Sequence, residues 1–413
     1  MDLPFLMLVL LLTGIGVIMV FSASYATAYL QEDKSPTFYF FRQALFAAAG
    51  LTVMYITSKI NYQTFRWLSV FALGLAVLLL IAVLIPGIHT SRSDGVKRWI
   101  AVPGIGTFQP SEIAKVAVIM YFSARLSKRN TEKPRRLSPR SPLSGVVGFL
   151  DRIGFLELVP YGLILLLIVG LMMLEPHMSG ILLTTAIVGT ILLLGGSGGI
   201  ITWGCAGAAL FLLETLLKHV DSIDYLQSRL EGWTQDLDQM TSQTKQSLYA
   251  IGSGGATGLG LGNSIEKQLW LPESTNDFIF SVVCEELGFV GAVIVIVLFV
   301  LFLVQGFWIA FHAENRFCTL VGIGIMAQIA WQVFCNIAVV TNTLPNTGIS
   351  LPFFSSGGTS LILLLAEMGV MVNIGRNGER ARLEREEAHA ERERQRKAKT
   401  IVLDTARRAQ TEQ

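Results

Sequence analysis

A carboxylate stands at the start of a long apolar segment near the middle of this chain. The stretch WLPESTNDFIFSVVCEELGFV, residues 270–290, places Asp277 where a polar, proline-containing segment gives way to an almost wholly apolar run. A helix that begins here would favour the ionised form of Asp277 through its dipole and free amides. Asp277 or Asn276 could simply cap that helix. A carboxylate at the edge of water could instead accept a proton from a hydroxyl group, which is general-base chemistry.

Other ionisable residues fall inside apolar segments. Such a side chain costs at least ~2.5 kcal/mol in a membrane span on insertion scales, so each one is a functional candidate. Glu112 and Lys115 share a helical face, where they could pair with each other or with a ligand. Glu285 and Glu286 are adjacent and point about 100° apart on a helix, so only one could pair with Lys115 or an arginine. For Glu367, in the last apolar segment, we expect structural pairing.

Two further segments carry groups that could bind an anion. HTSRSDGVKR, residues 89–98, holds three cations, among them Lys97 and Arg98. NTLPNTGISLPFFSSGGTS, residues 342–360, contains prolines and glycines that cannot continue a helix. Irregular backbone survives at membrane depth only when it is buried in protein or lines a cavity. Its hydroxyl groups could bind a phosphate or sugar, or only satisfy the loop's own amides: Ser355, Ser356, Thr359 and Ser360.

The composition indicates which elements position these groups. The chain has 413 residues, of which 52% are hydrophobic and 15% charged, with a mean hydropathy of +0.55. Soluble domains carry about 25% charged residues, so the sequence predicts an integral membrane protein. A net charge of +2 gives no basic surface for nucleic acid. The four cysteines all lie in apolar segments and indicate neither a disulfide framework nor a metal site.

Apolar segments of about 20 residues, the length that crosses about 30 Å of hydrocarbon, recur along the chain. We predict about ten transmembrane helices, near residues 3–30, 38–58, 67–87, 107–126, 155–175, 178–196, 198–217, 278–311, 317–342 and 356–375. The predicted fold is all-α and polytopic, with a membrane domain over residues 1–376 and a charged tail over 377–413. The first segment lacks a basic leading region, so we do not expect a cleaved signal peptide.

Lysine and arginine collect between the fourth and fifth predicted spans and in the tail. By the positive-inside rule both regions are cytoplasmic, and ten spans place both termini on that side. A loop of residues 218–277, between the seventh and eighth spans, then lies outside the cytoplasm and is too long for a simple connector. Its first half has amphipathic helical spacing, with an apolar face of Tyr225, Leu226, Leu230 and Trp233 that could lie in the membrane interface. Its second half, GSGGATGLGLGNS, fits no phosphate-binding motif, which favours a flexible or close-packed turn over a phosphate-binding loop.

Five strings that carry these groups occur in one order along the chain. They are GVKRW (95–99), FQPSEIAK (108–115), QSLYAIGSGG (246–255), LPESTNDFIFSVVCEELGFVG (271–291) and NTLPNTGISLPFFSSGGTSLI (342–362). Together they resemble the shape, elongation, division and sporulation (SEDS) family, which includes FtsW, RodA and SpoVE. The string VFSASYATAY (20–29) is more similar to the division and sporulation branches than to the elongation branch.

The resemblance implies a peptidoglycan glycosyltransferase of cell division, which polymerises lipid II on the outer face of the bacterial cytoplasmic membrane and releases undecaprenyl diphosphate. Asp277 matches the family's essential acidic residue and would activate the acceptor's 4-hydroxyl. Glu112 and Lys115 match its buried pair, and Arg98 falls among its external basic residues. Cations and hydroxyls would hold the diphosphate, where charge develops. The residues with this expected role are Lys97, Arg98, Lys115, Ser355, Ser356 and Thr359.

The implied partners are lipid II, the growing glycan strand, a class B penicillin-binding transpeptidase and other division proteins. No cofactor follows from the sequence; a divalent cation, Mg or Mn, at the diphosphate is compatible with it, although no ligand cluster is present. The string EPHMSG (175–180) departs from the Gln-Pro-Asp-Leu-Gly of many members, with His177 in place of the aspartate. Any role of that aspartate is therefore not transferred to this chain.

Other functions remain open at this point. Ten spans with buried charges also fit a transporter that flips lipid-linked precursors. An elongation or sporulation paralogue of the same enzyme, or a scaffold that docks partners through its basic loop and tail, would share much of the pattern. Asp277 separates the classes, because a flippase needs no base at the water boundary and a scaffold needs no buried charges.

Overall fold

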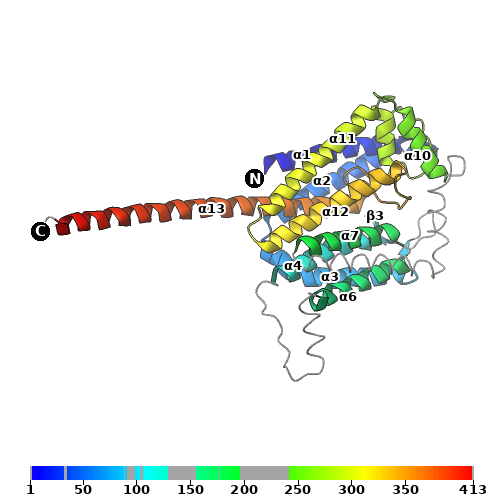
Figure 1. Cartoon of the computed structure of the whole chain (residues 1–413). Coiled ribbons are helices and arrows are strands. Elements are labelled where there is room, and N and C mark those ends of the chain that lie inside the picture. Colours follow the sequence, from blue (N-terminus) through cyan, green and yellow to red (C-terminus); the bar gives the residue numbers. More distant parts are fainter. Residues whose placement is uncertain are drawn as a thin grey trace, which may run out of the picture.

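The computed structural model describes residues 2–31, 35–87, 89–90, 98–102, 106–128, 155–175, 177–195 and 241–411. Helices dominate this part of the chain (Figure 1). They are α1 (Leu3–Ala26), the π-helical η1 (Thr27–Gln31), α2 (Phe38–Lys59), α3 (Tyr62–Leu84), α4 (Pro110–Lys128), α6 (Phe155–Leu174), α7 (Met178–Leu194), α10 (Ser242–Ser253), α11 (Ile279–Phe311), α12 (Arg316–Val340) and α13 (Gly358–Thr411). Short strands β1 (His89–Thr90), β2 (Trp99–Val102) and β3 (Gly106–Phe108) form one antiparallel sheet in that order.

Six of the described helices are long and apolar enough to cross a membrane: α1 continued into η1, α2, α3, α11, α12 and α13. Two shorter apolar helices, α6 and α7, accompany them. The predicted all-α, polytopic fold is therefore confirmed. The predicted seventh span, residues 198–217, lies outside the described residues, as does the amphipathic face of Tyr225, Leu226, Leu230 and Trp233, so the count of ten stays a prediction.

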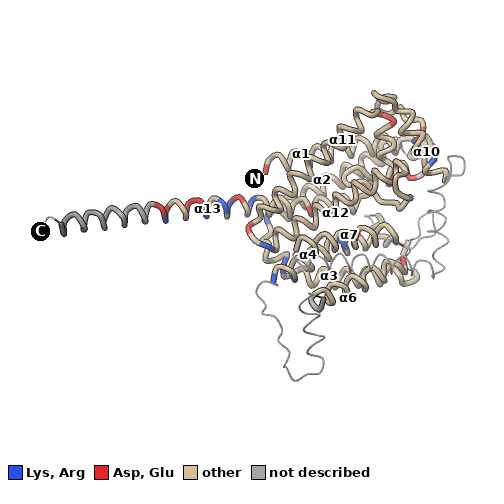
Figure 2. Tube along the Cα trace, viewed as in Figure 1, with Lys and Arg blue, Asp and Glu red and all other residues tan. Residues whose placement is uncertain are grey.

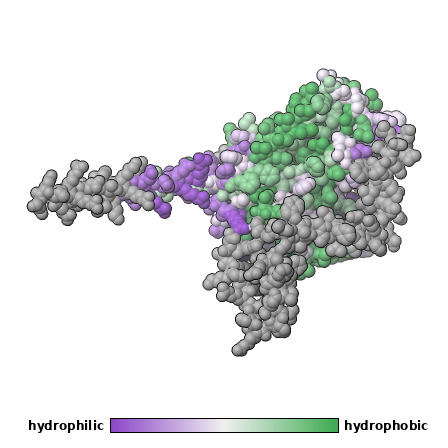
Figure 3. Space-filling model, viewed as in Figure 1, coloured by the Kyte–Doolittle hydropathy of each residue, from purple (hydrophilic) through white to green (hydrophobic). Residues whose placement is uncertain are grey.

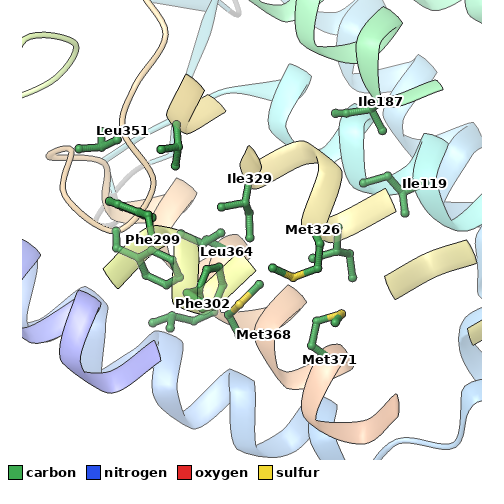
Figure 4. Close-up of a cluster of buried hydrophobic side chains, with 14 of the residues drawn as sticks. Ile119, Ile187, Phe299, Phe302, Met326, Ile329, Leu351, Leu364, Met368 and Met371 are labelled. Carbon is green, nitrogen blue, oxygen red and sulfur yellow. The ribbon is translucent and has the colours of Figure 1, made fainter. Parts of the chain in front are cut away.

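The helices pack side by side around a continuous apolar core. α13 packs along α2, α3 along α4, and α11 along α12, while α12 also packs on α4 and α7. Figure 4 shows the centre of this core, to which α4, α7, α11, α12, α13 and the loop before α13 contribute large side chains. Among the labelled residues are Phe299 and Phe302 of α11, Met326 and Ile329 of α12, and Met368 and Met371 of α13, all buried.

The surface of the bundle is apolar, and charged side chains concentrate elsewhere. Hydrophobic residues cover the exposed sides of α1 and α11 (Figure 3). Charges gather on the part of α13 that projects from the bundle (Figure 2). α13 runs without interruption past residues 376 and 377, the predicted boundary between the membrane domain and the tail. We call the end of the bundle from which α13 projects the tail end, and the opposite end, which carries residues 241–278, the α10 end.

α11 is interrupted within its first turns. Gly288 has φ 67° and ψ −171°, so the helix breaks there. The glycine-rich segment after α10 fills the break: the amides of Leu259 and Gly260 donate to the carbonyls of Glu285 and Glu286, at 3.0 and 2.9 Å. The amides of Phe289 and Val290 donate in return to Gly255 and Ala256, at 2.9 and 3.1 Å. Of the two predicted alternatives, a flexible or a close-packed turn, the structure shows the close-packed one, and its hydrogen bonds leave these four backbone groups of α11 paired.

Candidate active site

Asp277 lies in a turn immediately before α11 rather than at the cap of that helix. The N-cap residue is Phe278, and it makes no side-chain capping bond. The turn is closed by the carbonyl of Glu273, which accepts from the amides of Asn276 and Phe278 at 3.0 and 3.3 Å. Glu273 has φ 55°, a conformation that side chains rarely adopt. Asp277 therefore precedes the N-cap residue of α11 by one position.

Two neighbouring elements fix the backbone of this turn. Asn336 of α12, fully buried, donates from Nδ2 to the carbonyl of Asp277 and to that of Ile349, both at 2.7 Å. Ser355 donates from Oγ to the carbonyl of Asn276 at 2.8 Å. The turn that carries Asp277 is thus tied to α12 and to the loop between α12 and α13.

A polar cavity of about 180 Å³ lies at the α10 end and contains the predicted site. Three carboxylates and two cations of the described chain line it together. Asp277, Glu112 and Glu273 are the carboxylates, and Arg98 and Lys115 are the cations. The remaining polar lining includes Gln109, His177, Ser179, Gln243, Asn276, Gln332, Asn346, Ser350, Ser355, Ser356, Thr359 and Ser360.

Most of the predicted site residues therefore meet in one place, although not all in the expected role. Lys97 lies outside the described residues. The Ser355 hydroxyl donates to Asn276, and the amide of Ser356 donates to the carbonyl of Thr275 at 2.8 Å, so both residues hold the Asp277 turn. The Thr359 hydroxyl donates to the carbonyl of Thr107 in β3 at 3.3 Å.

Lys115 and Glu112 form the internal ion pair that their spacing allows. Lys115 Nζ lies 2.9 Å from Glu112 Oε1, and the lysine is buried while the glutamate is partly exposed to the cavity. Glu367 lies deeper, beside an adjoining pocket, where both its carboxylate oxygens accept from Gln328 Nε2 at 3.1 Å. Glu367 therefore has a structural partner, as expected, and that partner is the side-chain amide of Gln328.

The two adjacent glutamates of α11 face away from the cavity and bind the preceding loop instead. Glu286 Oε1 lies 2.6 Å from Lys267 Nζ and accepts from Ser22 Oγ of α1 at 2.6 Å. Lys267 is 3% exposed and Glu286 0%. Glu285 accepts from the Ser264 hydroxyl, and from the Ile265 amide at 2.9 Å. Glu286 thus pairs with Lys267, not with the predicted alternative Lys115.

Sequence reasoning missed Glu175 as a site residue and treated His177 only as a departure from the family. Both lie in the turn between α6 and α7, next to Arg98. Burial raises the pKa of Glu175 to about 8, although the Arg98 charge opposes the shift. Burial, then Arg98 and Lys115, lower the pKa of His177 to about 3, so this imidazole is neutral. His177 Nε2 lies 3.0 Å from Gln109 Nε2, which donates to it.

A glycine beside Asp277 gives a direct test of the geometry. Gly348 has φ 70°, and a methyl group on it would lie 3.2 Å from Asp277 Oδ2. Gly262 has φ 86° with nothing within 4 Å of that position. Both alanine variants bear similar backbone strain, about 1–2 kcal/mol. We expect Gly348→Ala alone to lower activity, by about tenfold, because it displaces the carboxylate. Equal activities of the two variants, at matched thermal stability, would contradict this placement of Asp277.

The fold and the cavity define a class: a polytopic helical membrane protein with a charged polar cavity at one end of its bundle. The chain matches the family model described as "Cell cycle protein", of FtsW, RodA and SpoVE, over residues 2–380. It is 35% identical to the "Probable peptidoglycan glycosyltransferase FtsW" of Trichlorobacter lovleyi, covering 90% of this chain and 92% of that protein. It is 36% identical to the "Stage V sporulation protein E" of Bacillus subtilis, covering 91% and 97%. The chain belongs to the FtsW/RodA/SpoVE family, as the resemblance predicted.

Solved structures show the same fold. A chain in the structure described as "Structural coordination of polymerization and crosslinking by a peptidoglycan synthase complex" matches with a TM-score of 0.67 and 22% identity, covering 91% of this chain and 97% of that one. The rod shape determining protein RodA of Thermus thermophilus matches with a TM-score of 0.62 and 24% identity, covering 90% and 96%.

Proposed function

We propose that this protein is a peptidoglycan glycosyltransferase that polymerises lipid II into glycan strands during cell division. The names of its FtsW relatives support the activity and the division role. The observation that carries the proposal is that Asp277 lines one cavity with Arg98 and Lys115. A base and cations in one cavity match the two needs of the reaction, which are a deprotonated hydroxyl and stabilisation of a departing diphosphate.

In the proposed reaction, the 4-hydroxyl oxygen of the acceptor attacks the anomeric carbon of the donor. Asp277 accepts the proton of that hydroxyl. The bond between that carbon and the diphosphate oxygen breaks, and the lipid diphosphate leaves with the electron pair. Arg98 stabilises the charge that develops on the leaving group. Lys115, paired with Glu112, contributes positive potential from the cavity wall. The hydroxyl of Ser355 holds the Asp277 turn in place during the reaction.

The proposed setting is the bacterial cytoplasmic membrane, with both termini in the cytoplasm and the α10 end outside. The basic segments between α4 and α6 and along α13 support this orientation through the positive-inside rule. A class B penicillin-binding transpeptidase and other division proteins are the proposed partners. The structural neighbour is part of a peptidoglycan synthase complex, and its membership of that assembly motivates the proposal of a partner here.

Among the described residues, no group of three or more His, Cys, Asp or Glu side chains could hold a metal ion. The cavity residues therefore do not offer a dedicated site for the Mg or Mn ion considered from the sequence. The proposed reaction routes no step through a metal.

The decisive experiment is glycan synthesis from lipid II by the purified protein, alone and with its transpeptidase, with and without a metal chelator. Lipid-linked glycan polymers are the expected product. Movement of lipid II across proteoliposomes without polymer, under all these conditions, would replace the proposal by a flippase.

Glu175 predicts how the reaction depends on pH. Its pKa of about 8 keeps it mostly protonated at pH 7, so that it adds no negative charge beside Arg98. As pH rises through about 8, the carboxylate forms beside Arg98 and weakens the positive potential, and we expect the KM for lipid II to rise. Glu175→Gln removes this rise. A KM profile between pH 7 and 9 that is the same in both proteins would contradict the assignment.

The same group makes a prediction for stability, with a definite sign. The folded-state pKa of Glu175 lies above its ordinary value of 4.5, so the folded protein holds this proton more tightly than the unfolded chain. The contribution of Glu175 to stability is therefore full below pH 4.5, falls as pH rises to about 8, and is constant above that. Thermal unfolding of Glu175→Gln against the parent over this range measures it.

A further inference from the structure

We propose that residues 254–270, the segment between α10 and the Asp277 turn, form a lipid-contacting anchor in the membrane–water interface. We call this segment the interfacial loop. The proposal rests on the membrane-spanning fold and on surface chemistry, and it stands or falls independently of the proposed catalytic activity.

The depth of the interfacial loop follows from the length of α11. From Gly288 to Phe311, the end of the helix, roughly 23 residues rise about 35 Å. This is close to the roughly 30 Å of the hydrocarbon layer. Trp308 lies within the last turn, with its ring centroid 4.1 Å from that of His312, in the position expected of an aromatic residue at the opposite interface. The break at Gly288 therefore lies at the membrane boundary of the α10 end.

The interfacial loop is seated at that depth by its backbone. The four hydrogen bonds between residues 255–260 and residues 285–290 place it beside the break in α11. The first side chains of α11 beyond the break, Phe289 and Val290, are exposed and apolar, and on a spanning helix they face lipid. The outer surface of the interfacial loop is therefore continuous with a lipid-facing surface.

The interfacial loop exposes its large apolar side chains and covers its charged ones, as expected of a segment in the membrane interface. Its large apolar residues are exposed: Leu259 39%, Leu261 55%, Ile265 57%, Leu269 46% and Trp270 62%. Its two charged residues are not fully exposed: Lys267 is buried and pairs with Glu286, and Glu266 is half-buried with its Oε2 atom covered. A loop that faces water normally exposes its charged side chains and buries its large apolar ones. This loop exposes leucine and tryptophan and buries its lysine, as expected of a segment in the membrane interface.

The backbone holds one of these exposed residues in a strained conformation. Leu269 has φ 68°, which is rare for a bulky side chain. Such a residue costs about 1–3 kcal/mol unless its surroundings compensate. Transfer of the exposed side chains of Leu269 and Trp270 from water into the membrane interface is favourable in free energy, and it offsets the cost of this strain. The same anchor would fix the height of Asp277, seven residues beyond Trp270, above the bilayer.

Depth-dependent fluorescence quenching tests the proposal without any activity assay. Leu261→Cys and Trp270→Cys are each labelled with bimane in a Cys205→Ser background, since Cys284, Cys318 and Cys335 are buried. Ser242→Cys, exposed at the far end of α10, is the matched control. Each protein is placed in phosphatidylcholine–phosphatidylglycerol liposomes with or without lipids that carry a nitroxide at the headgroup or at acyl carbon 5.

We expect the lipid nitroxides to quench the labels at 261 and 270 at least about twofold more than the label at 242. Quenching at 261 and 270 equal to that at 242 overturns the proposal. Weak lipid quenching, together with shielding of the two labels from a soluble quencher when the transpeptidase is added, also overturns it and assigns the surface to a protein partner.

Discussion

Replacement of Asp277 by asparagine is expected to lower the rate of glycan polymerisation by a factor of about 10² to 10⁴, the usual contribution of a general base. The amide has nearly the shape of the carboxylate but cannot accept the acceptor's proton. The backbone bonds from Asn336 and Ser355 go to main-chain carbonyls of the turn, so the variant keeps them. The expected signature is a fall in kcat with an unchanged melting temperature.

The matched control for this experiment is another carboxylate of the same cavity. Glu273→Gln keeps an oxygen that can accept from Asn276 Nδ2, which bonds Glu273 Oε2 at 2.5 Å. We expect this variant to retain most of the activity. Polymerisation by Asp277→Asn at the parent rate would remove Asp277 from the reaction. Equal losses in both variants would show a general loss of negative charge rather than the loss of one base.

The largest expected change in stability follows from Lys267→Met. This variant leaves the fully buried Glu286 without its cation, which costs about 3–5 kcal/mol of unfolding free energy when a buried pair is broken. We expect a clear drop in the melting temperature of the detergent-solubilised protein. The double variant Lys267→Met with Glu286→Gln removes the unpaired charge, and we expect it to recover most of the loss.

An exposed ion pair supplies the comparison. Arg382 and Glu386 on α13 lie 2.8 Å apart, with both side chains more than half exposed. Arg382→Met removes a cation from this pair, and we expect no measurable change, because solvent screens such pairs. A melting temperature of Lys267→Met equal to that of Arg382→Met would mean that the buried pair does not hold the interfacial loop.

The sequence predicts the described helices closely because a membrane leaves little choice. An apolar run of about 20 residues must pair its own backbone groups, so it forms a helix, although a helix such as α13 can continue beyond its apolar run. Asp277, Arg98 and Lys115 were each candidates from the sequence, and the structure brings all three to the lining of one cavity. The roles of individual hydroxyls were not, because a serine in a loop gives no sign of which carbonyl its hydrogen reaches, as Ser355 shows.

Lys267 shows why the remaining contacts could not be predicted. A lysine in a polar loop normally stays in water, and no helical or strand periodicity links it to Glu286, nineteen residues later. The break at Gly288 was equally hidden, since a single glycine in an apolar run is compatible with a continuous helix. Glu175 was passed over because it ends an apolar span, where a charged residue ordinarily reaches water.

The length of α13 has a mechanical consequence. Its 54 residues would extend about 80 Å as one rod. The rod begins at Gly358, next to Thr359 on the cavity wall, and it ends beyond the bundle at Thr411. A helix resists bending and twisting far more than a loop does, so a twist applied to the projecting part reaches Thr359 without an intervening hinge. A single continuous helix therefore couples the projecting tail mechanically to the cavity wall.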